Sequence, residues 1–137
     1  MFVRSGVVML VCALYGTGAS ETRCPSNVAK QAEEQASSVR DWDEMYTAYK
    51  RFGQCDDGGI SEAFSDSVGR LLSTGNGALR RLLTLISKAA EFERFVIRHI
   101  DETIPVDVLA VVEKNATDHC PKGGDRLCRA IQQAARR

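Results

Sequence analysis

The sequence carries no excess of charge of either sign. Its 137 residues include 18 lysines and arginines and 18 aspartates and glutamates. Because non-specific nucleic-acid binding needs a basic footprint, we expect no nucleic acid among the partners. The same balance argues against a strongly anionic or cationic molecule as the main ligand.

Recognisable catalytic signatures are missing as well. The chain contains no G-x-S-x-G, S-x-x-K or H-E-x-x-H pattern and no Gly-rich phosphate loop. His119 and Cys120, taken with Cys55 and Cys128, match no zinc-binding spacing. We therefore expect a protein that is not an enzyme and that uses no cofactor and no metal.

The sequence also lacks a run of about 20 apolar residues, the length that a membrane span requires. Its longest apolar stretch, residues 6–14, follows Arg4 and precedes the small residues 16–20. This order is typical of a secretory signal peptide that is cleaved after Ala19 or Ser20, and a permanent N-terminal anchor is the alternative. We expect residues 1–20 to be removed, residues 21–137 to be exported to the periplasm or secreted, and no transmembrane segment after cleavage.

Strand-like alternation is also absent after the signal, whereas apolar residues recur at helical spacing throughout. The pattern predicts one all-α domain, a compact bundle of five to seven short helices stapled by two disulfides. The expected helices cover residues 25–38, 42–52, 59–72, 78–89, 90–101, 105–115 and 125–136. For the second helix, we expect Asp41 and Glu44 to form a capping box and Gly53 to adopt the left-handed C′ conformation.

Cysteine pairing follows from the predicted cleavage. Removal of the signal takes Cys12 and leaves Cys24, Cys55, Cys120 and Cys128, an even number that suggests two disulfides in an exported chain. An antiparallel hairpin of the first two helices would place Cys24 beside Cys55, and Cys120 and Cys128 flank a short loop. We prefer Cys24–Cys55 with Cys120–Cys128; Cys55–Cys120 with Cys24–Cys128 is the alternative.

The segment CDDGGISEAFSD contains four carboxylates: Asp56, Asp57, Glu62 and Asp66. An EF-hand needs acidic ligands at alternate positions and a glutamate at the twelfth, but the twelfth residue from Asp56 is Ser67. Two readings remain open for Asp56 and Asp57. They cap the third helix, or they join Glu62 and Asp66 in a surface that binds a partner.

His99 falls on the apolar side of its helix, seven residues after Phe92. The simplest expectation is a histidine at the edge of the core whose ring nitrogens bond to the backbone. Two functional alternatives use the same region. A small-molecule or lipid carrier would have a pocket lined by Phe64, Phe92, Phe95 and His99. A small hydrolase would use His99 as a base, oriented by Asp101 or by a carboxylate from elsewhere in the chain.

Three stretches carry a resemblance to known proteins: YKRFGQCDDGGISEAFSDSV, EFERFVIRHIDET and NATDHCP. The chain from about residue 41 to 128 resembles an uncharacterised family of small exported proteins of proteobacteria. The resemblance implies a periplasmic or secreted setting and no particular chemistry. By architecture alone, the chain is also similar in kind to periplasmic all-α immunity proteins that block cell-wall amidase toxins.

These observations favour an exported, non-enzymatic protein-binding module of the inhibitor or immunity type. Its partner would be another exported or periplasmic protein. The candidate binding surface consists of Asp56, Asp57, Glu62 and Asp66.

Overall fold

A computed structural model describes residues 24–75 and 77–137, and the expected signal peptide lies outside the described residues. The described chain is helical and contains no β-strand, which confirms the predicted all-α class. Each of its helices is too short or too polar to cross a membrane. The elements are α1 (Ser26–Ser38), α2 (Trp42–Phe52), the 3₁₀ helix η1 (Gly53–Cys55), α3 (Gly58–Ser73), α4 (Ala78–Ile86), α5 (Ala90–Arg98), α6 (Val106–Asp118) and α7 (Asp125–Ala135).

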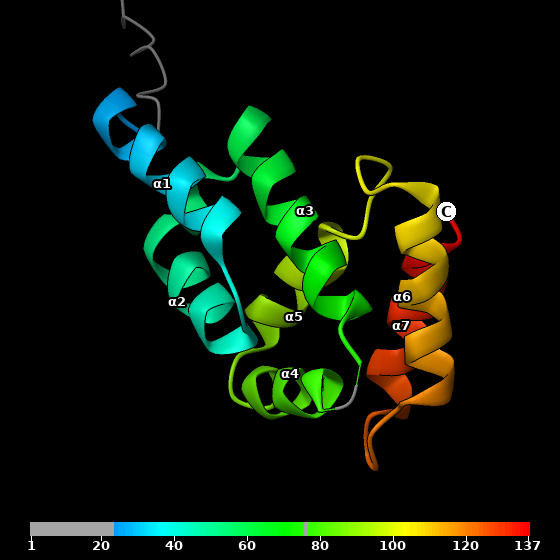
Figure 1. Cartoon of the computed structure of the whole chain (residues 1–137). Helices are drawn as coiled ribbons and strands as arrows, with labels where there is room; N and C mark the ends of the chain where they lie inside the picture. Colours follow the sequence, from blue (N-terminus) through cyan, green and yellow to red (C-terminus); the bar gives the residue numbers. More distant parts are fainter. Residues whose placement is uncertain (1–23, 76) are drawn as a thin grey trace, which may run out of the picture.

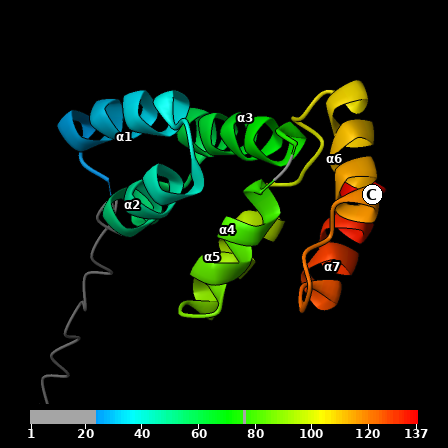
Figure 2. The ribbon, with the colours of Figure 1, turned by 60° about the horizontal axis from the view of Figure 1, so that its bottom comes forward.

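Helix α3 lies at the centre of the arrangement (Figure 1). It packs against α1 on one side and against α6 on the other, and α6 lies alongside α7. Helices α4 and α5 contact each other and lie between the α1–α2 pair and the α6–α7 pair (Figure 2). The largest fully buried side chains come from α2, α3 and α5, namely Trp42, Met45, Phe64, Phe92 and Phe95.

The starts of α2 and α3 follow the capping signals of the sequence. Asp41 precedes α2, and its carboxylate accepts a hydrogen bond from the Glu44 amide at 2.8 Å. The Glu44 carboxylate accepts from the Arg40 amide, one residue before the position that a full capping box uses. Asp57 caps α3 and accepts from the Gly58 amide. Of the capping box predicted for α2, the hydrogen bond from the Glu44 amide to Asp41 is present, and the bond from the Asp41 amide to the Glu44 side chain is replaced by one from the Arg40 amide.

The end of α2 differs from the prediction. Gly53 has φ −59° and ψ −24°, which is right-handed rather than left-handed. The chain continues as η1 because this tighter turn brings Cys55 to Cys24. The left-handed glycines in the described chain are Gly58, Gly77 and Gly123. Helices α4 and α5 also end earlier than expected, at Ile86 and Arg98.

Side chains from α3 satisfy carbonyl groups at the end of α1. The Arg70 guanidinium donates to the carbonyl oxygen of Val39 at 2.6 Å and to that of Ser37 at 3.3 Å. The buried Ser67 hydroxyl donates to the Ala36 carbonyl at 2.6 Å. The last turn of a helix has no intrahelical donors for these oxygens, so the contacts fix the packing of α1 on α3.

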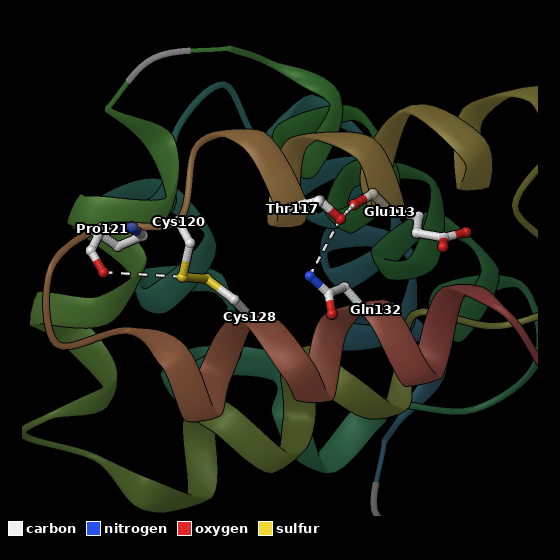
Figure 3. The surroundings of a disulfide bond; sticks show 6 residues. All are labelled: Glu113, Thr117, Cys120, Pro121, Cys128 and Gln132. Carbon is white, nitrogen blue, oxygen red and sulfur yellow. Dashed lines mark hydrogen bonds between the residues drawn. A yellow bond between two sulfur atoms is a disulfide. The ribbon is translucent and has the colours of Figure 1, made fainter.

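The preferred disulfide pairing is confirmed. Cys24 is bonded to Cys55 with a Cα–Cα distance of 5.0 Å, and Cys120 to Cys128 with 6.0 Å. The first bond closes the open end of the α1–α2 hairpin. The second ties the segment after α6 to the first turns of α7, as Figure 3 shows.

Removal of the two disulfides is expected to have unequal effects. The sequence separations are 31 and 8 residues. Under the chain-entropy relation, replacement of Cys24 and Cys55 by serine lowers the free energy of unfolding by about 3.7 kcal/mol, and replacement of Cys120 and Cys128 by about 2.5 kcal/mol. Urea unfolding of both double variants measures the difference. An equal loss, or a larger loss for the shorter loop, contradicts the expectation.

Candidate functional site

The corner between η1 and α3 places a carboxylate inside the protein. Asp56 follows the disulfide-bonded Cys55, and its side chain is only 7% exposed. Its Oδ1 atom lies 2.8 Å from Nε2 of His99, which is 1% exposed, and its Oδ2 atom contacts the guanidinium of Arg98. One buried carboxylate therefore holds two consecutive residues at the end of α5.

The hydrogen bonds of His99 indicate its protonation. Nδ1 lies 2.8 Å from the carbonyl oxygen of Phe95, which only accepts hydrogen bonds, so Nδ1 carries a proton. Nε2 faces the Asp56 carboxylate, so an ionised Asp56 requires a proton on Nε2 as well. Both ring nitrogens of His99 thus face acceptors at the C-terminus of α5, where the helix dipole favours positive charge.

Asp56 is held in its charged form by this arrangement. Burial alone would raise the pKa of Asp56, because a low-dielectric surrounding disfavours the carboxylate. The hydrogen bond and charge of His99, followed by those of Arg98, outweigh burial and lower the pKa below its usual range. The structure thus contains a buried Asp56–His99 pair with Arg98 at its surface edge.

A hydrolase that uses His99 as a base could have Asp101 as the residue that orients the ring. In the structure, the Asp101 carboxylate bonds to other residues. It accepts hydrogen bonds from the hydroxyl of Ser65 at 2.7 Å and from the amide and hydroxyl of Thr103. Ser61 places its hydroxyl 3.5 Å from Nε2 of His99. Since Asp56 already occupies Nε2, a base role for His99 would require Asp56 to release that nitrogen.

The four residues of the candidate pocket do meet, but as a packed cluster. Phe64, Phe92, Phe95 and His99 are all at most 2% exposed. The Phe95 ring lies 5.0 Å from that of Phe64 and 4.3 Å from that of His99, centroid to centroid. These are contact distances for aromatic pairs, so the rings themselves fill the space between α3 and α5.

The remaining carboxylates of the corner face solvent. Asp57, Glu62 and Asp66 are exposed, the last two one turn apart on α3. The structure therefore keeps these three on the surface and turns the Asp56 side chain inward. Within residues 24–75 and 77–137, no three His, Cys, Asp or Glu side chains are grouped as metal ligands.

The partnership of Asp56 and His99 could not be inferred from the sequence. The two residues are 43 positions apart, and no local pattern relates them. The available signals were indirect. The sequence places His99 on an apolar helical face and makes Asp56 one of two possible caps of the third helix. The structure assigns the cap to Asp57 and leaves Asp56 for His99.

Fold and site together define a small all-α domain with two disulfides and a buried Asp–His pair. A scan against protein-family models and searches of curated proteins and of solved structures found no match to the chain. The resemblance to exported proteobacterial proteins remains a prediction.

Asp56→Asn should destabilise the protein by about 2–3 kcal/mol, because the amide keeps one oxygen acceptor but removes the carboxylate charge that contacts both the buried His99 ring and the Arg98 guanidinium. Asp66→Asn is the matched control, since Asp66 is an exposed aspartate on α3, the helix that follows Asp56. Chemical denaturation of both variants at neutral pH gives the comparison. Losses that agree within about 0.5 kcal/mol would contradict a stabilising role for the buried pair.

The same pair predicts an acid dependence. The pKa of Asp56 is lower in the folded protein than in the unfolded chain, so its contribution is complete above the ordinary Asp pKa of about 3.9 and is lost as pH falls through the folded value. The difference in free energy of unfolding between wild type and Asp56→Asn should therefore narrow below about pH 4. A difference that stays constant down to about pH 2 would refute this linkage.

Proposed function

We propose that this protein is an exported, non-enzymatic protein-binding module of the inhibitor or immunity type. It binds another exported or periplasmic protein through the acidic face, which we define as Asp57, Glu62 and Asp66. The observation that carries the proposal is that these three exposed carboxylates form no ion pair with any residue of the described chain.

Export is supported by the cysteines. Disulfides form and persist in oxidising compartments, and all four cysteines of the described chain are paired. A domain of this size gains stability from such crosslinks when it must remain folded outside the cell. The N-terminal sequence pattern supports the same compartment.

The balanced total charge conceals a strong local imbalance. Residues 24–75 contain five basic and nine acidic side chains, a formal charge of −4. Residues 77–137 contain eleven basic and eight acidic side chains, a charge of +3. A basic partner is therefore compatible with the acidic half of the chain, although the total charge argued against a strongly charged ligand.

The acidic face lies on a well-anchored element. Helix α3 packs against α1 and α6, and its first residues follow the Cys24–Cys55 disulfide and the buried Asp56. Glu33 of α1 lies beside the start of α3, since a Cβ on Gly59 would be 3.8 Å from its Oε1 atom. Carboxylates on such a rigid surface lose little conformational freedom on binding, and they accelerate encounter with a basic partner.

The proposal is tested by charge reversal. The double variant Glu62→Lys/Asp66→Lys should lose a partner that the tagged wild-type protein captures from an oxidising periplasmic extract, because two attractive contacts become repulsive. Glu102→Lys/Asp107→Lys changes the total charge equally at exposed positions outside the acidic face and should retain the partner.

Circular dichroism and thermal unfolding establish that both variants fold. Mass spectrometry identifies the captured protein, and its affinity is then measured with purified components at two salt concentrations. Retention of the partner by Glu62→Lys/Asp66→Lys, or an affinity that does not fall with salt, would overturn the proposal.

A further inference from the structure

A second surface feature lies between α5 and α7, which contact each other. It is a groove of about 570 Å³. We call it the arginine groove, and its lining residues are Glu93, Arg94, Ile97, Arg98, Ala130 and Arg137. It shares no residue with the acidic face and belongs to the basic half of the chain.

The floor and the rim of the groove differ in chemistry. Ile97 and Ala130 are half-buried and supply apolar surface, whereas Arg94, Arg98 and Arg137 are exposed. Glu93 is the one carboxylate side chain of the lining, and Arg126 binds both of its oxygens, at 2.5 and 2.7 Å. The negative charge of Glu93 is therefore neutralised by Arg126, which does not line the groove.

The three arginines differ in how they are held. Arg98 is bound by the buried Asp56, and Arg94 forms an exposed pair with Glu91. Arg137 forms no ion pair with the described residues. Exposed arginine pairs contribute little energy and exchange readily with an external carboxylate, so Arg94 and Arg137 are available to a ligand.

We propose that the arginine groove binds an acidic peptide segment of a partner protein. An aliphatic or aromatic side chain of the segment lies on Ile97 and Ala130, and flanking carboxylates pair with Arg94 and Arg137. Two properties of the groove select this occupant. Arg137, which forms no ion pair with the described residues, and Arg94, whose exposed pair with Glu91 exchanges readily, favour a ligand with carboxylates, and the apolar floor favours a side chain that gains by leaving water.

Asp56 prepares the groove for this ligand. It holds the Arg98 guanidinium from the protein side and is itself fixed by His99. Arg98 is thereby fixed as part of the groove wall, beside the two arginines with which the ligand pairs. The surface site is thereby connected to the buried ion pair.

The experiment is an NMR titration of the ¹⁵N,¹³C-labelled protein with synthetic peptides. The probe alternates Leu and Phe with Asp and Glu. One comparison peptide replaces the acidic residues by Lys, and a second replaces Leu and Phe by Gly. We expect the probe to shift Ile97 and Ala130 methyl signals and both comparison peptides to bind at least about tenfold more weakly.

Arg94→Glu/Arg137→Glu should weaken probe binding by about tenfold or more, because both variant side chains repel carboxylates. The control Arg80→Glu/Arg129→Glu makes the same charge change at exposed positions outside the groove and should bind within about twofold of wild type. Circular dichroism verifies the fold of both.

Three results would overturn the proposal. The first is equal binding of the acidic and lysine peptides. The second is a shift pattern that omits Ile97 and Ala130. The third is a concentration-dependent shift of these residues without peptide, which would assign the groove to a second copy of the chain. None of these outcomes involves Glu62 or Asp66, so failure of the groove proposal is distinguishable from failure of partner binding by the acidic face.

Discussion

The hydrogen bond between the buried carboxylate of Asp56 and Nε2 of His99 constrains three parts of the molecule at once. It fixes the corner that leads into α3, it fixes the end of α5, and through Asp56 it orients Arg98 at the surface. Such a pair is costly to bury, so both partners must be present for the site to be stable. Removal of either partner leaves a polar group inside the protein without its counterpart.

The disulfides and the surface chemistry are arranged around this constraint. Cys55 directly precedes Asp56, so its disulfide to Cys24 restricts the backbone of the same corner between η1 and α3. The short Cys120–Cys128 loop restrains the start of α7, and Ala130 of α7 and Arg137, which follows this helix, line the arginine groove. The acidic face and the arginine groove are thus presented by restrained elements, as expected for surfaces that bind other proteins without large rearrangement.

Much of the fold could be predicted from the sequence because its signals are local. Helical periodicity predicts five to seven helices, and the described residues form seven; the position of each cysteine relative to a helix end favours the pairing that the structure contains over the alternative. The predictions were wrong where contacts between distant segments determine the local conformation. Gly53 continues into η1 because Cys55 must reach Cys24, and Asp56 turns inward because His99 approaches from a distant segment. The arginine groove joins residues of α5 and α7 with Arg137, which follows α7, and no local sequence pattern marks it.

The central claim is that His99 is a doubly protonated donor to Phe95 and Asp56. It is tested most directly by ¹⁵N NMR of the imidazole nitrogens at neutral pH, with the exposed His119 as an internal reference. The account predicts that both His99 nitrogens carry protons and exchange slowly with water, and that Asp56→Asn abolishes this signature. A neutral His99 ring with an unprotonated Nε2 in the wild-type protein would contradict it.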